Sequence, residues 1–93
     1  MKLKEPLLFR QQAYIDGVWC DADSGATFAV DNPATGEIIG QVPDMGGAET
    51  RRAIDAANAA LPAWSKMSAK ARGAILRKWF DLIMANADDL AQL

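Results

Sequence analysis

One segment near the middle of the chain constrains the fold most, because two strand-like runs flank strong turn residues. The runs cover residues 27–30 and 37–42. Asn32 suits the first position of a type I turn, and Pro33 suits the second because its ring presets φ. Gly36 can adopt the left-handed conformation that returns the chain at little cost. The segment therefore predicts a β-hairpin.

A second strand pair is predicted at residues 13–20, before this hairpin. The dipeptide Asp16-Gly17 is a strong two-residue hairpin turn, and apolar residues lie on both sides of it. Residues 1–10 are expected to form an irregular arm, and residues 21–25 a polar loop. The first 43 residues therefore predict two β ribbons.

The polar loop contains Asp21, Asp23 and Gly25, residue types found in calcium-binding loops. An EF-hand loop, however, needs glycine at its sixth position and glutamate at its twelfth. Counted from Asp21, those positions hold Ala26 and Asn32. The sequence therefore favours a turn over a metal site.

The rest of the chain predicts helices, after a connector at residues 44–47. The first helix is expected from Ala48 to Leu61, with Glu49 in its first turn, where a negative charge suits the helix dipole. Arg51 and Asp55 are four residues apart and could pair on the solvent side. Pro62 should end or kink the helix. Apolar residues recur at spacings of three and four and predict one buried face: Ile54, Ala57, Leu61 and Trp64.

A second helix is predicted over residues 68–86, with Ser68 as its N-cap and Asn86 as its end. A third helix should open at Asp88 or Asp89, and its single turn cannot stabilise itself, which suggests the front part of a longer protein. The first two helices are expected to pack as neighbours. The buried face of the second helix is predicted to contain Ile75, Leu76, Trp79, Leu82 and Ile83.

Composition limits the classes of partner. The 93 residues are 51% hydrophobic, and the net charge of −2 with dispersed basic residues argues against nucleic acid. The single cysteine fits a reducing, cytoplasmic compartment. No targeting segment or run of membrane-spanning length is visible. Trp64, Trp79 and Phe80 are expected at a core or interface and not in a ligand box.

Catalytic groups are scarce. The chain has no histidine, so an imidazole base is ruled out within these residues. Gly46-Gly47 resembles a phosphate loop only faintly and is interpreted as a connector. Cys20 is interpreted as a packing residue, since an acidic residue follows it and no electropositive setting is evident. Asp88 and Asp89 are interpreted as a helix cap.

Two motifs in succession resemble a known family. The runs "DNPATGEIIGQVP" and "AETRRAIDAANAALPAW" closely resemble the N-terminal region of NAD(P)-dependent aldehyde dehydrogenases. The start, "LLFRQQAYIDGVW", looks most like the succinate-semialdehyde dehydrogenase branch, and the resemblance covers nearly all of the chain. Ala71 departs from it, because relatives often carry glutamate there.

The resemblance implies a parent enzyme with the α/β aldehyde dehydrogenase fold, several times longer than this chain. Residues 1–93 would be the first part of its cofactor-binding domain, with β ribbons at 1–43 and helices at 48–93. In this family a cysteine thiolate attacks the aldehyde, hydride passes to NAD or NADP, and a glutamate-activated water releases the acid.

The resemblance also bears on sites. The family's catalytic cysteine, glutamate and oxyanion asparagine and its cofactor motifs all lie beyond residue 93, so no residue here is assigned as catalytic or cofactor-binding. The backbone carbonyls of Val30 and Asp31 match positions that hold a monovalent cation in some members. A small aldehyde substrate and a homo-oligomer, dimer or tetramer, are implied, with neither a nucleic acid nor a membrane partner.

Two alternatives stay open. The parent could belong to another aldehyde dehydrogenase branch, such as one acting on betaine aldehyde. The chain could instead be a free-standing interaction module that uses its helical faces. If the chain is the N-terminal piece of an aldehyde dehydrogenase, the 93 residues alone should be inactive.

Overall fold

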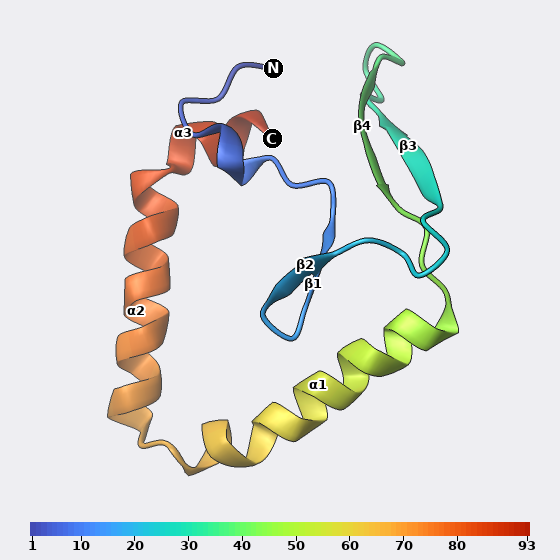
Figure 1. Ribbon diagram of the computed structural model, residues 1–93. Helices are drawn as coiled ribbons and strands as arrows, with labels where there is room; N and C mark the ends of the chain where they lie inside the picture. The colour runs from blue at the N-terminus through green and yellow to red at the C-terminus, as the bar shows by residue number, and fades with distance from the viewer. The chain divides into compact units, whose positions relative to one another are not determined.

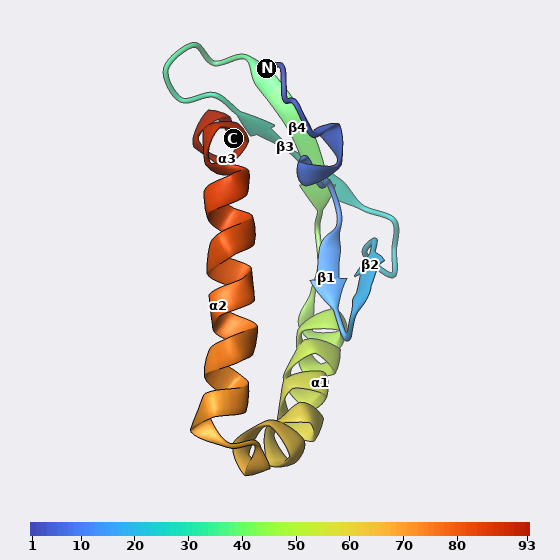
Figure 2. The same ribbon diagram turned by 90° about the vertical axis from the view of Figure 1, so that its left-hand side faces the viewer.

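The computed structural model describes residues 1–93 as four short strands followed by three helices, with one turn of 3-10 helix near the start (Figures 1 and 2). This confirms the two predicted β-hairpins and the helical second half. In chain order the elements are η1 (Pro6–Leu8), β1 (Ala13–Ile15), β2 (Val18–Cys20), β3 (Thr27–Asp31), β4 (Ile38–Pro43), α1 (Gly47–Lys66), α2 (Ala69–Ala85) and α3 (Ala87–Gln92).

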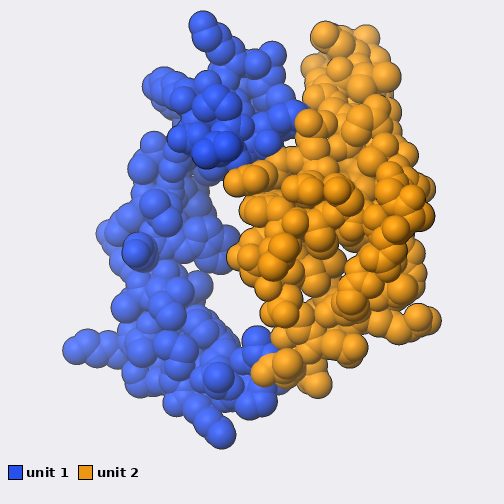
Figure 3. Space-filling view, in the orientation of Figure 1, with its two compact units in different colours: residues 1–9, 60–93 blue, residues 10–59 orange.

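The chain divides into two compact units (Figure 3). One unit contains Arg10–Ala59, with both hairpins and most of α1. The other contains Met1–Phe9 together with Ala60–Leu93.

The hairpin β1–β2 has the predicted tight turn. Asp16 has φ 52° and Gly17 has φ 76°, the left-handed pair that a two-residue hairpin turn of type I′ requires. Tyr14 pairs with Trp19 across the ladder, and their ring centroids are 5.0 Å apart. The Arg10 guanidinium lies 4.8 Å from the centre of the Trp19 ring, so this aromatic pair also has a cationic neighbour.

The hairpin β3–β4 is antiparallel from Thr27 opposite Pro43 to Asp31 opposite Ile38. Asn32 shapes its turn: its side chain accepts a hydrogen bond from the Ala34 amide at 2.9 Å, and its carbonyl accepts one from the Gly36 amide at 2.7 Å. Gly36 has φ 73°, as its predicted left-handed role requires.

Helix α1 begins at Gly47 and continues to Lys66, so the predicted end near Leu61 is wrong. Pro62 lies inside the helix, because a proline removes only one backbone donor and the other turns of a 20-residue helix keep the conformation. The predicted Arg51–Asp55 pair does not form. The Arg51 guanidinium instead lies back over Gly47, where an added Cβ would meet it at 3.5 Å.

The predicted capping of α2 is confirmed. The Ser68 side chain accepts a hydrogen bond from the Ala71 amide at 3.1 Å, and Asn86 is the C-cap. Residues 1–10, expected to be irregular, contain the η1 turn. Proline at its first position fixes φ, and the Glu5 side chain accepts a hydrogen bond from the Leu7 amide at 3.1 Å, which caps the turn.

Burial differs most from the prediction. The one buried apolar residue is Ala22, at 6% exposure. Trp79, predicted to be buried, is 63% exposed. A helix face is buried only where another element lies against it, and these side chains remain exposed. The other members of the two predicted faces that remain exposed are Ile54, Ala57, Leu61, Trp64, Ile75, Leu76, Leu82 and Ile83.

Candidate functional site

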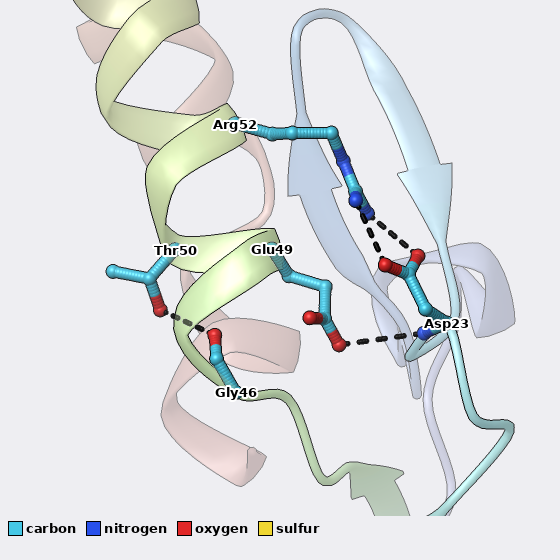
Figure 4. A network of polar contacts seen from close by, with 5 residues as sticks. All are labelled: Asp23, Gly46, Glu49, Thr50 and Arg52. Atoms are coloured by element: carbon cyan, nitrogen blue, oxygen red, sulfur yellow. Dashed lines mark hydrogen bonds and ion pairs between the residues drawn. The ribbon is translucent and has the colours of Figure 1, made fainter.

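A network of polar contacts in the Arg10–Ala59 unit joins the loop after β2 to the first turns of α1 (Figure 4). The two terminal nitrogens of Arg52 each donate to an oxygen of Asp23 at 2.8 Å. Glu49 accepts a hydrogen bond from the Asp23 amide at 3.3 Å. One residue of the loop is thus held by both its side chain and its backbone.

The start of α1 sets the positions of these groups. Glu49 and Arg52 are three residues apart, so they lie on one face of the helix. Thr50 points elsewhere and donates its hydroxyl to the carbonyl of Gly46 at 2.9 Å, just before the helix begins (Figure 4). Gly46 is therefore the last residue before α1, and its carbonyl is bound by the first turn of the helix.

Glu49 is an unusual member because it is only 6% exposed. A carboxylate in the first turn is favoured by the helix dipole, as the sequence predicted. Its bond to the Asp23 amide gives it a further partner, and a buried charge needs such partners. Its burial was not predicted.

The electrostatics of the pair follow from its geometry. Hydrogen bonding from the Arg52 guanidinium holds the pKa of Asp23 below its ordinary value of 3.8. The same bond raises the pKa of Arg52. Both side chains are about half exposed, so the pair fixes geometry more than it adds stability.

A shallow depression of about 530 Å³ lies beside this network. Cys20 lies in its wall, half-buried at the end of β2. The chain has no histidine to act as a base for the thiol, and the positive charge of the nearby Arg52 is paired with Asp23. The lining residues are Ile15, Asp16, Cys20, Arg52, Asp55 and Ala56.

The polar loop after β2 forms a turn, and two of its acidic side chains are bound to other residues of the chain. Asp21 accepts a hydrogen bond from the Gln12 side chain at 3.1 Å, and Asp23 is bound to Arg52. Gly25 has φ 75°, and its amide donates to the carbonyl of Ala22 at 2.8 Å, which closes the turn. No group of three or more His, Cys, Asp or Glu side chains in the chain could hold a metal ion.

Val30 and Asp31 lie at the end of β3, beside an irregularity of the ladder. Val30 pairs with Gly40 and Asp31 with Ile38, so Ile39 is left as an extra residue on β4. Two adjacent carbonyls could supply part of a cation's shell, but a hard cation usually takes six or more oxygens. These residues therefore fit at most part of such a site.

In the other unit, Asp89 has a role that the sequence did not reveal. It was interpreted as a helix cap, but its two oxygens accept hydrogen bonds from the amides of Lys4 and Glu5, at 3.0 and 2.8 Å. Asn86 precedes α3 without a side-chain cap bond. The partners are 84 and 85 positions away, and no local pattern signals such a pairing.

No helix combines the length and apolar composition that crossing a bilayer would need. The polar groups described above bind other parts of the same chain.

Comparison with known proteins gives relatives over the whole chain. It is 66% identical over 93 residues to the glutarate-semialdehyde dehydrogenase of Pseudomonas aeruginosa, covering 100% of this chain and 19% of that protein. It is 58% identical over 93 residues, with the same coverage, to the NADP(+) succinate-semialdehyde dehydrogenase GabD of Escherichia coli. The chain thus spans about a fifth of the length of these relatives.

A solved structure of such an enzyme also resembles this chain. The crystal structure of succinate-semialdehyde dehydrogenase from Burkholderia pseudomallei superimposes with a TM-score of 0.95 at 60% identity, over 99% of this chain and 19% of that chain. The sequence profile described as "Aldehyde dehydrogenase family" matches residues 19–93. With this match and these relatives, the resemblance seen in the hairpin and helix motifs is confirmed, and the chain belongs to the aldehyde dehydrogenase family.

Proposed function

We propose that this chain is the N-terminal segment of a longer NAD(P)-dependent dehydrogenase that oxidises a semialdehyde bearing a carboxylate. The observation that carries the proposal is the match over the whole chain to semialdehyde dehydrogenases about five times as long. A segment that corresponds to a fifth of an enzyme contributes to its fold and not to a complete reaction.

In this proposal residues 1–93 form the first part of the cofactor-binding domain, with β ribbons at 1–43 and helices at 48–93. The exposed apolar face of α2 supports this role, because large exposed apolar patches mark surfaces that another element covers. Within each hairpin the backbones of the two strands are paired, but Tyr14, Phe28 and Ile38 are also exposed and would be covered in the same way.

The chemistry would come from outside the segment. Cys20 has no histidine to pair with, and the positive charge of its neighbour Arg52 is paired with Asp23. The catalytic thiol, the carboxylate that activates water and the nicotinamide-binding residues are proposed to lie beyond residue 93. Val30 and Asp31 are proposed to give two backbone carbonyls to a monovalent cation whose other ligands come from elsewhere.

NAD or NADP is the proposed cofactor, and the relative GabD carries NADP(+) in its name. When bound, this cofactor accepts the hydride of the aldehyde. The whole protein is proposed to be a cytoplasmic homo-oligomer, without a nucleic acid or membrane partner. The net charge of −2 and the single cysteine support this setting.

The proposed substrate is a short semialdehyde that bears a carboxylate. Relatives named for succinate semialdehyde and for glutarate semialdehyde are both close to this chain. These substrates share a carboxylate and an aldehyde and differ by one methylene. One methylene in a pocket discriminates by only about 10–200-fold, so both compounds should react and one should be preferred.

The test uses the full-length protein. Nicotinamide reduction is measured with succinate semialdehyde, glutarate semialdehyde and betaine aldehyde, each with NAD and with NADP. We expect one of the two carboxylated semialdehydes to have the highest kcat/KM. Cys20→Ser, the matched control, should leave kcat/KM within about twofold of wild type, since a substitution away from the chemistry has a small effect.

Other outcomes would replace the proposal. Preference for betaine aldehyde would place the protein in another branch of the family. No reduction with any aldehyde, together with a 93-residue product that is monomeric and unfolds cooperatively, would favour the free-standing interaction module. Activity of the 93-residue chain, abolished by Cys20→Ser, would overturn the assignment of the chemistry to later residues.

A further inference from the structure

The N-terminal arm, residues 1–9, is bound to α3 by one side chain. Asp89 Oδ1 accepts a hydrogen bond from the Lys4 amide at 3.0 Å, and Asp89 Oδ2 accepts one from the Glu5 amide at 2.8 Å. Each carboxylate oxygen thus has its own donor, and the donors are consecutive in the chain. Asp89 is only 7% exposed although it carries a charge.

This arrangement satisfies both partners. The Lys4 and Glu5 amides each find an acceptor, and the Asp89 carboxylate finds a donor for each of its oxygens. A carboxylate removed from water is costly unless its oxygens accept hydrogen bonds. The pKa of Asp89 lies below its ordinary value because these two amides stabilise the charged form.

The other polar contact between the arm and this part of the chain is weaker. Lys4 Nζ lies 3.8 Å from a carboxylate oxygen of Asp88, and both side chains are almost fully exposed. Exposed ion pairs at this distance contribute little. Glu5 is occupied within the arm, where its side chain caps the η1 turn. The charged groups around Asp89 are therefore Lys4, Glu5 and Asp88.

We propose that Asp89 is a latch: its carboxylate fixes the N-terminal arm on α3, and its loss frees the arm without unfolding α2. The device is separable because its bonds run to two amides of the arm and to no part of α2. The inference rests on this geometry and not on the activity proposed above.

Trypsin gives a direct readout in the full-length protein. It cleaves after Lys4, and the nitrogen of the Lys4–Glu5 bond is the donor to Asp89 Oδ2. Cleavage therefore requires the latch to open. Intact mass distinguishes the product that begins at Glu5 from one that begins at Leu3.

We expect Asp89→Ala to raise the cleavage rate at Lys4–Glu5 by about tenfold or more, because hydrogen bonds to a charged group are lost. Asp89→Asn keeps one acceptor oxygen and should give an intermediate rate. Asp88→Ala is the matched control, at the neighbouring carboxylate, and should change the rate by less than about twofold. Equal effects of Asp89→Ala and Asp88→Ala would overturn the proposal.

A second variant separates release from unfolding. In a deletion of residues 1–5, amide hydrogen exchange of α2 should match that of wild type. Loss of α2 protection in this variant would overturn the latch, because the arm would then support the helix. If the deletion folds but Asp89→Ala does not, Asp89 has a structural role beyond the arm, and the proposal also fails.

Discussion

The two hairpins and helix α2 differ in how their backbone hydrogen bonds and apolar side chains are satisfied. In β3–β4 each strand pairs with its neighbour in the chain, and Gly36, at φ 73°, makes the return possible. In α2 the backbone is satisfied within the helix and at Ser68, but Trp79 is 63% exposed. Local chemistry thus defines the turns and the strand pairing of the hairpins, whereas the exposed apolar side chains of α2, like Phe28 and Ile38 of β3–β4, need another surface to cover them.

The largest expected effect follows from that face. In the full-length enzyme, Trp79→Ala should lower the free energy of unfolding by about 3–5 kcal/mol, the usual range for emptying a buried aromatic site. In the isolated 93-residue chain, where Trp79 is exposed, the change should be within about 0.5 kcal/mol. Denaturant unfolding of both forms measures this contrast.

The same variant tests whether α2 contacts substrate. KM for the semialdehyde should stay near the wild-type value in whatever Trp79→Ala enzyme still folds, because Trp79 and its apolar neighbours offer no group to orient a carbonyl. A wild-type melting temperature with a greatly raised KM would place Trp79 in the aldehyde pocket. Lys78→Ala, at the adjacent residue, should change stability by no more than about 0.5 kcal/mol.

The next effect concerns the hairpin turn. Gly36→Ala should destabilise by about 1–2 kcal/mol, because an L side chain is disfavoured in the left-handed conformation. An added Cβ would meet nothing within 4 Å, so the loss would come from the backbone and not from a clash. Gly73→Ala, inside α2 and equally unobstructed, should instead stabilise by up to about 1 kcal/mol. A change in melting temperature of the same sign for both variants would contradict this prediction.

A smaller effect is expected at the start of α2. Ser68→Ala removes the acceptor of the Ala71 amide and should cost about 1 kcal/mol. Ser65→Ala is the control, since the Ser65 hydroxyl only donates to the carbonyl of Pro62 within α1. Its cost should stay within about 0.5 kcal/mol. Equal losses in urea unfolding would show that the Ser68 cap contributes nothing specific.

The smallest and most local effect depends on pH. The pKa of Asp89 is lowered in the folded chain by hydrogen bonds from the Lys4 and Glu5 amides. Its stabilising contribution is therefore fully present above the ordinary pKa of 3.8 and is lost as the pH falls through the lower folded value. Hydrogen exchange of residues 1–9, corrected for intrinsic rates, should be constant from neutral pH down to that range. Loss of protection near neutral pH would contradict this assignment.

The sequence predicted the elements whose signals are local. Asp16-Gly17, Asn32 with Gly36, and the Ser68 cap each depend on neighbours within a few positions. The sequence did not predict that α1 continues past Pro62. The remaining turns of this 20-residue helix keep the helical conformation despite the proline.

The polar anchors were missed for a different reason. Asp23 and Arg52 are 29 positions apart, and Asp89 lies 85 positions from Lys4, so no spacing rule brings them together. Burial on α2 could not be predicted from its periodicity either, because a helical pattern shows which face is apolar but not which surface covers it. The family motifs, by contrast, were recognisable because their order along the chain is itself a signal.

Helix α2 is expected to belong to a larger fold whose other residues cover its apolar face. Amide hydrogen exchange of residues 69–85, measured in the full-length protein and in the isolated 93-residue chain, tests this most directly. We expect strong protection in the full-length protein and little in the isolated chain, which should be partly disordered or self-associated. Equal protection of α2 in a monomeric isolated chain would contradict the account.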